Sequence, residues 1–375
     1  MFLGATLKDN KNHSGDRNTV LVVGASGVVG SAAVRQFAAA GWQVIGTSRR
    51  EPVIDAAYDY VPMDLESPES VAASLQRFSE VTHIVYAALF EMPELVAGWR
   101  SQQQIQTNQR MLENLFEPLL KITSSLRQVI LLQGGKAYGA HVGQLLVPAK
   151  ESAARVEHAN FYWLQEDYLR AVQVDYDWGL TIFRPQIVFG DALNAAMNLI
   201  PAIGVYGALL KEQGRALHYP GGESALLEAV DADLLGDAFI WAFETPEALN
   251  ETFNVTNGDV FVWQNVWPVI AEALGMEAGD NKPCLLAETL PQQVGDWNRI
   301  VSKYGLVAPE MDYFVGQGFQ YADVLFATGA KDRPPPKLLS TIKIRQAGFG
   351  RCIDTEDMFR KWFGLFQQRR LLPLP

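Results

Sequence analysis

Cysteine is scarce in this chain of 375 residues, which contains only Cys284 and Cys352. The two lie far apart and neither belongs to a CxxC pair, so we expect reduced thiols and a cytoplasmic protein. The five histidines show no spacing typical of metal ligands. We therefore expect neither a structural nor a catalytic metal.

Long apolar runs and an excess of positive charge are also missing. The most apolar stretch, around residues 199–210, is interrupted by Pro201 and two glycines and is too short to span a membrane. The formal net charge of -11 disfavours phosphate-rich partners, so we expect neither nucleic acid nor a membrane as a partner. Residues 1–17 have too short an apolar part for a signal peptide, and we expect a flexible arm there.

The first half of the chain alternates short β-rich runs with helical patterns. Strands are predicted at residues 20–23, 44–47, 60–63, 83–87, 128–132 and 180–183, and helices at 28–40, 68–78, 101–122 and 161–174. Such alternation is typical of an α/β fold with a doubly wound parallel sheet covered by helices on both faces.

The pattern loosens beyond residue 190. We predict a helix over 192–212 that is broken at Pro201, a late strand at 252–255 that returns to the sheet, and a mainly helical remainder. The expected organisation is a Rossmann-like, NADP-binding domain over 18–190, rejoined by 220–260. A smaller, mainly helical substrate-binding domain would comprise 191–219 and 261–375.

A glycine-rich turn, Gly24-Ala-Ser26-Gly27-Val-Val-Gly30, follows the first predicted strand and opens the first helix. Its glycines permit a tight turn and the close approach of a pyrophosphate, and the helix N-terminus favours the phosphate charge. A glycine triplet is in some proteins a plain structural turn. Here the strand, the turn and the helix together favour a dinucleotide site.

The end of the second predicted strand indicates which dinucleotide is bound. NAD-binding folds usually place an acidic residue there for the ribose hydroxyl, whereas this chain has Ser48-Arg49-Arg50. The arginines would pair with the 2′-phosphate of NADPH; the alternative is two solvated surface arginines. Asp64-Leu65, after the third strand, would flank the adenine, although an Asp at a strand end is often a helix cap.

The glycine turn and Thr47-Ser-Arg-Arg resemble the short-chain dehydrogenase/reductase superfamily, and residues 184–190, 231–234 and 253–258 resemble its extended branch. The usual Tyr-x-x-x-Lys signature is absent, because the residue four positions after Tyr162 is Glu166. A lysine lies upstream instead, at Lys136 within L-x-x-G-x-K-x-Y. This pattern, combined with Asn160-Phe-Tyr162, is similar to the progesterone 5β-reductase and iridoid synthase family.

The resemblance implies NADPH-dependent reduction of a small apolar α,β-unsaturated carbonyl compound. Tyr162 would donate to the developing enolate oxygen, and Lys136 would lower the pKa of that tyrosine. The implied cofactor contacts are Gly24, Ser26, Gly27, Val28, Val29, Gly30, Ser48, Arg49, Arg50, Asp64, Leu65, Ala87, Asn108, Gln133, Tyr162, Pro185, Ile187, Ala196 and Met197.

The candidate residues also have purely structural interpretations. Without the family pattern, Lys136 would be interpreted as a surface loop lysine. Glu166 and Asp167 would be interpreted as solvated or capping carboxylates. Helical periodicity predicts that Phe161, Leu164, Tyr168 and Val172 form the core face of their helix, which leaves Tyr162 off that face. His141 either lines the pocket mouth or is an ordinary loop residue. The late aromatics either wall the pocket or form core: Trp263, Trp267, Tyr304, Tyr313, Phe314, Phe319 and Tyr321.

The sequence also departs from the family pattern. Ala137 stands where the family usually has a histidine, and residues 139–142 replace a bulky segment, so we expect a substrate pocket unlike the steroid or iridoid one. A 1,2-carbonyl reductase would use the same residues. A nucleotide-sugar epimerase or dehydratase is disfavoured by the missing Tyr-x-x-x-Lys, and an NADPH-sensing regulator by the intact Lys136 and Tyr162. A homodimer is one option for the assembly.

Overall fold

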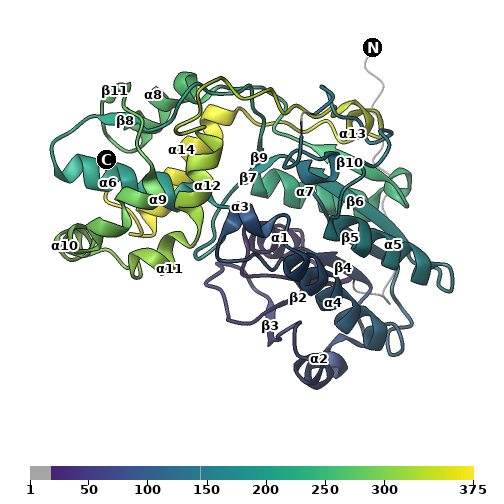
Figure 1. Cartoon of the computed structure of the whole chain (residues 1–375). Helices are drawn as coiled ribbons and strands as arrows, with labels where there is room; N and C mark the ends of the chain where they lie inside the picture. The colour runs from purple at the N-terminus through teal and green to yellow at the C-terminus, as the bar shows by residue number, and fades with distance from the viewer. Residues whose placement is uncertain (1–17, 144) are drawn as a thin grey trace, which may run out of the picture.

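The computed structural model of this protein describes residues 18–143 and 145–375, so the arm predicted at 1–17 lies outside the described residues. Seven parallel strands form the central sheet, in the order β10-β6-β5-β4-β1-β2-β3 (Figure 1). Their bounds are β1 (Thr19–Val23), β2 (Gln43–Ser48), β3 (Asp59–Pro62), β4 (His83–Tyr86), β5 (Gln128–Leu132), β6 (Gly179–Pro185) and β10 (Thr252–Val255). The prediction of a doubly wound parallel sheet is confirmed.

Helices cover both faces of the sheet because successive side chains of each buried strand point in opposite directions. Val20 and Val22 of β1 pack in one cluster with α1 (Val28–Ala39) and α7 (Ala232–Glu244). Leu21 and Val23 pack in another with α4 (Gln102–Leu119) and α5 (Phe161–Gln173). The continuous apolar run of β1 therefore serves two cores.

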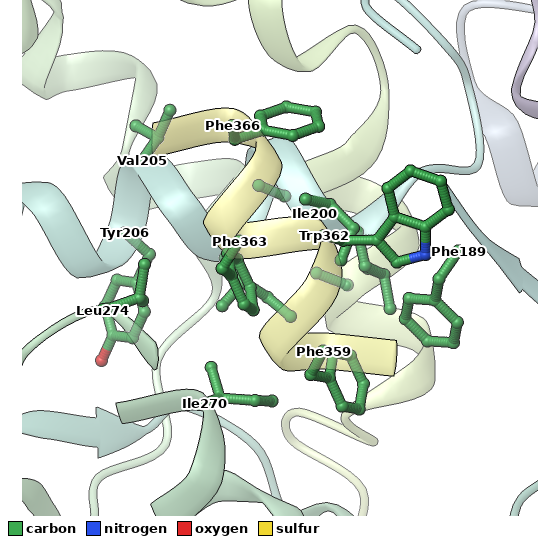
Figure 2. Close-up of a cluster of buried hydrophobic side chains, with 14 of the residues drawn as sticks. Phe189, Ile200, Val205, Tyr206, Ile270, Leu274, Phe359, Trp362, Phe363 and Phe366 are labelled. Atoms are coloured by element: carbon green, nitrogen blue, oxygen red, sulfur yellow. The ribbon is translucent and has the colours of Figure 1, made fainter. Parts of the chain in front are cut away.

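A second, mainly helical part surrounds the short pair β8 (Leu217–Tyr219) and β11 (Ala278–Asn281). In its core, Phe359, Trp362 and Phe363 of α14 pack against side chains of α6 and α8 (Figure 2). The helices of this part are α6 (Leu199–Glu212), α8 (Trp263–Ala273), α9 (Leu286–Thr289), α10 (Val294–Tyr304), α11 (Met311–Val315), α12 (Gly318–Leu325) and α14 (Thr355–Gln368).

Smaller elements complete the fold. β7 (Ile187–Phe189) pairs with β9 (Ala229–Asp231), α2 (Pro68–Ser74) follows β3, and α3 (Leu95–Gly98) follows β4. The helix α13 (Ile342–Gln346) packs on β10, with Ile344 and Phe349 in the sheet's own core. This placement differs from the predicted division, which assigned residues 261–375 to the substrate domain. The rest of that division stays a prediction.

The helix predicted over 192–212 is wrong in its first turns and in its break. α6 begins only at Leu199, where the side chain of Asn198 accepts a hydrogen bond from the Ile200 N–H at 3.3 Å. Pro201 lies in the first turn, where a backbone N–H has no partner within the helix, so the proline is tolerated. Residues 192–198 form a loop instead.

In the described part of the chain, no helix combines the length and the apolar character that crossing a membrane requires.

Candidate active site

A cavity of about 870 Å³ lies at the carboxyl ends of the sheet strands. The glycine turn, the end of β2 and the segments after β4 and β5 line one part of it, and residues of the second part complete the wall. Ligands of open α/β sheets bind at this edge, because the loops that follow parallel strands converge there.

The glycine turn has the geometry of a phosphate cradle. Gly24 has φ +91°, and a Cβ at this position would lie 2.8 Å from the backbone of Ala88, so only glycine fits. Gly27 is the N-cap of α1 and provides no side-chain cap, and the first turn contains no acidic residue. The helix N-terminus therefore presents N–H groups and positive potential to the cavity.

Two of the predicted cofactor residues do not line the cavity. A Cβ on Gly30 would lie 2.1 Å from the Gly24 carbonyl oxygen, so this glycine allows α1 to pack closely against the turn. Asn108 is fully buried, and its amide bonds the backbone of Phe90 twice, at 2.9 and 2.8 Å. Asn108 thereby holds the loop after β4, which carries Glu91.

The remaining predicted cofactor residues line the cavity, and those outside the glycine turn and the end of β2 are Asp64, Leu65, Ala87, Gln133, Tyr162, Pro185, Ile187, Ala196 and Met197. Asp64 Oδ1 also accepts the Glu66 N–H at 3.1 Å, as a capping residue would. Their contacts with a cofactor stay predictions.

The turn after β2 displays two arginines. The Ser48 hydroxyl donates to the Arg50 carbonyl oxygen at 2.6 Å, and Tyr60 donates to the Ser48 carbonyl oxygen at 2.8 Å, which fixes the turn. Arg49 and Arg50 are exposed and line the cavity. Within residues 18–143 and 145–375 neither guanidinium has a carboxylate partner, and that of Arg50 lies 5.0 Å from the ring centre of Tyr313. Both cations are available to an anion.

The core face predicted for α5 is incomplete. Phe161 is buried, and Leu164, Tyr168 and Val172 are partly buried against core clusters. Tyr162, Gln165, Glu166 and Leu169, which the prediction left off this face, are buried as well. Periodicity of apolar residues fails here because polar side chains find buried partners: Gln165, for example, donates to the Asn108 carbonyl oxygen at 2.9 Å. The helix therefore turns Tyr162 inward, toward the cavity.

Asn160 connects Tyr162 with Lys136. Its side-chain oxygen accepts the Tyr162 N–H at 3.0 Å and caps α5, while its amide donates to the Lys136 carbonyl oxygen at 3.0 Å. One residue thus fixes the start of the helix relative to the loop after β5. These two hydrogen bonds give Asn160 a structural role in the segment Asn160-Phe-Tyr162.

Lys136 is not a surface lysine. Its ammonium lies 3.4 Å from Glu91 Oε1, and the two side chains are only 16% and 4% exposed. The ring of Trp99 lies 4.1 Å from the same ammonium, and Gln104 donates to the other Glu91 oxygen. Burial raises the pKa of Glu91 and lowers that of Lys136, while the ion pair opposes both shifts.

The expectation that Lys136 lowers the pKa of Tyr162 is also wrong. Burial raises the pKa of the Tyr162 hydroxyl, and the charge of Glu91 raises it further. Sequence reasoning missed Glu91, although its place just after β4, at the carboxyl edge of the sheet, was a signal. Since Lys136 is paired with this carboxylate, Tyr162 stays a protonated phenol that can donate a hydrogen bond.

Glu166, at the position where most relatives of the superfamily have lysine, is a buried structural residue and not a solvated one. It accepts a hydrogen bond from Gln133 at 2.9 Å and lies 3.7 Å from the Arg184 guanidinium. Burial raises its pKa, but the bonds from Gln133 and Arg170 and the charge of Arg155 lower it on balance. Asp167 is exposed, as expected.

The structure also separates the remaining candidates. His141 lines the cavity, as do Tyr313 and Tyr321. Tyr304 is exposed, whereas the other late aromatics belong to the core of the second part: Trp263, Trp267, Phe314 and Phe319. The described residues contain no group of three or more His, Cys, Asp or Glu side chains placed to hold a metal ion.

A family model and the curated relatives of the chain agree with one another. The family model of the PRISE-like Rossmann-fold domain matches residues 55–373. An (S)-8-oxocitronellyl enol synthase from Nepeta racemosa is 30% identical over 99% of this chain and 98% of its own. A 3-oxo-Delta(4,5)-steroid 5-beta-reductase from Arabidopsis thaliana is 27% identical over 95% of this chain and 93% of its own.

Solved structures that resemble the chain include epimerases and a short-chain dehydrogenase/reductase superfamily protein. A UDP-glucose 4-epimerase from Bifidobacterium longum, determined with NAD+ and UDP, has a TM-score of 0.66. The match covers 94% of this chain and 99% of the epimerase, at 14% sequence identity. At that identity the likeness shows the fold alone.

Proposed function

Since the chain belongs to the PRISE-like Rossmann-fold family, within the extended short-chain dehydrogenases/reductases, we propose that it reduces α,β-unsaturated carbonyl compounds with NADPH. The observation that carries the proposal is the buried Tyr162 hydroxyl in one cavity with Lys136 and Glu91, a cavity that begins at a glycine-rich phosphate cradle. Relatives named as an enol synthase and a steroid 5-beta-reductase cover almost the whole chain.

The residues at the cofactor end of the cavity fit NADPH. Gly24 and Gly27 would admit the pyrophosphate to the N-terminus of α1, and Arg49 and Arg50 would pair with the 2′-phosphate. The turn after β2 does not place a carboxylate ahead of these arginines, which disfavours NAD. When bound, the cofactor supplies a hydride to the β-carbon of the substrate.

Tyr162 would stabilise the charge that develops on the carbonyl oxygen of the substrate. Addition at the β-carbon moves electrons onto that oxygen and forms an enolate, which a fixed hydroxyl donor stabilises more than it stabilises the ground state. The raised pKa of Tyr162 keeps the proton on the phenol, so the group acts as a hydrogen-bond donor. Burial strengthens this bond, because little water competes for it.

Lys136 and Glu91 would set the electrostatics beside that donor. The ammonium of Lys136 adds positive potential near the developing enolate, and Glu91 compensates its charge in the resting site. Asn160 keeps the lysine loop and the tyrosine helix at a fixed separation. These residues position a donor and a cation; they need no metal.

Product analysis tests the proposal. The purified protein is incubated with NADPH and 2-cyclohexen-1-one, and the products are identified by gas chromatography with mass spectrometry. We expect cyclohexanone, from 1,4-addition, and slower turnover with NADH. An allylic alcohol as the sole product would make the protein a 1,2-carbonyl reductase, and NADPH that is never oxidised by any enone would overturn the proposal.

The proposal extends to location and assembly. Cys284 and Cys352 are both free thiols, which supports a reducing compartment such as the cytoplasm. A homodimer is proposed as the assembly. Light scattering coupled to size-exclusion chromatography measures it, and a larger particle would contradict this.

A further inference from the structure

Lys337 brings to the cavity an ammonium group that has no partner in the described part of the chain. Its backbone is fixed in the loop before α13, since its N–H donates to the Leu226 carbonyl oxygen at 3.4 Å and its carbonyl oxygen accepts from Gln186 Nε2 at 2.5 Å. The side chain lines the cavity and is only partly exposed. Within residues 18–143 and 145–375, no carboxylate pairs with this ammonium and no acceptor bonds it.

The position of Lys337 is at the catalytic end of the cavity. Gln186, which holds its backbone, also lies against Gly135, the residue before Lys136. The charges of both lysines act on His141, whose pKa falls to about 4, chiefly through burial. Arg49 and Arg50 follow β2, which β1 and β4 separate from β5 in the sheet, so the cofactor arginines stand at a different place.

The charge of Lys337 is uncompensated there. Lys136 is paired with Glu91, and Arg369, another cation of the cavity wall, is paired with Asp191. Burial lowers the pKa of Lys337, as expected for a cation that has lost water without gaining a carboxylate. Although the chain has a net charge of -11, no described carboxylate neutralises this cation beside the reaction centre. Such a group costs stability unless a ligand supplies the missing anion.

We propose that the substrate carries a carboxylate, which pairs with Lys337 while the enone faces Tyr162. The inference rests on the proposed reductase function and replaces the wholly apolar substrate expected from the sequence with an oxo-alkenoic acid. Apolar and aromatic residues of the same cavity wall would accommodate the carbon skeleton: Phe161, Leu227, Tyr321, Val324 and Leu325. His141 is neutral at pH 7 because its pKa is lowered. It therefore offers no positive charge to the carboxylate, which pairs with Lys337 instead.

A matched pair of substrates tests the inference. (4-Oxocyclohex-2-en-1-yl)acetate and its methyl ester share the same enone and differ in the negative charge, which one methyl group removes. Each compound is assayed with NADPH and the wild type, Lys337→Met or Lys337→Arg. We expect the wild type to favour the acid. Lys337→Met should raise KM for the acid about 10- to 100-fold, the range for one charge-assisted hydrogen bond, and leave the ester unchanged. Lys337→Arg should restore most of the preference.

The matched control is Lys331→Met, because Lys331 is an exposed lysine of the same loop. This variant should leave KM unchanged for both substrates. If Lys337→Met raised KM equally for the acid and the ester, or for neither of them, the carboxylate inference would be overturned. The reductase function would still stand. If the wild type reduces neither compound, the reductase function fails instead. Calorimetric titration of the saturated acid into wild type and Lys337→Met then decides the inference by itself: equal affinities would refute it.

Discussion

Single residues decide the chemistry, and Tyr162 is the one whose role is most directly measurable. Its hydroxyl is buried at the cavity wall with a raised pKa, which suits a donor to an enolate oxygen. Removing one such donor from an oxyanion site costs about 10²- to 10³-fold in kcat. We expect Tyr162→Phe to lose that much in stopped-flow or steady-state turnover of a cyclic enone, with the Kd for NADPH nearly unchanged.

Tyr168→Phe is the control for this variant, since Tyr168 lies on the same helix but not on the cavity. Its turnover should equal that of the wild type. If Tyr162→Phe kept full turnover, the donor would have to be sought elsewhere in the cavity.

The residue scale also shows where sequence reasoning succeeds and fails. The motif placed Tyr162 and Lys136 at one cavity, because strand-end loops of a parallel sheet meet at one edge. It did not reveal Glu91, whose ion pair reverses the expected influence on Tyr162. Such a pair depends on where two loops approach each other in space, and no spacing along the chain records that distance.

At the scale of elements, the turn after β2 carries the coenzyme preference. Ser48 and Tyr60 fix its backbone, and the exposed Arg49 and Arg50 have no carboxylate partner in the described ranges. In Arg49→Ala/Arg50→Ala we expect the Kd for NADPH to rise about 10- to 100-fold while that for NADH stays constant. Fluorescence titration of each coenzyme measures the ratio.

Arg77→Ala, an exposed arginine away from the cavity, should leave both affinities as they are. An unaltered ratio in the double variant would mean that another part of the wall reads the 2′-phosphate.

Elements with regular apolar patterns were predictable, and those with polar buried faces were not. β1 is apolar throughout because it serves two cores, and its pattern predicts a central strand. On α5 the buried face contains Gln165 and Glu166, whose partners lie on α4, directly after β5 and on β6. Tertiary partners satisfy these groups, so a periodicity of apolar residues cannot identify that face.

At the scale of the whole molecule, the cavity depends on two cores being held together. Arg369, just after α14, lines the cavity and pairs with Asp191, while Lys361 of the same helix pairs with Asp231 and Asp233 at the start of α7. α14 therefore packs in the second core and also bonds the first part of the chain. The sequence signalled a helical C-terminal region but not this bridging position, which follows from long-range ion pairs.

Phe363 allows stability to be separated from catalysis in this arrangement. It is fully buried in the core that Figure 2 shows and does not line the cavity. Phe363→Ala should lower the free energy of unfolding by about 3–5 kcal/mol, through lost burial and the cavity that remains. Urea denaturation followed by far-UV circular dichroism measures the loss, and the folded variant should keep its kcat. Gln368→Ala, exposed on the same helix, should change stability by less than about 0.5 kcal/mol. A loss of kcat in Phe363→Ala while the protein is still folded would instead mean that α14 transmits its packing to the reaction centre through Arg369.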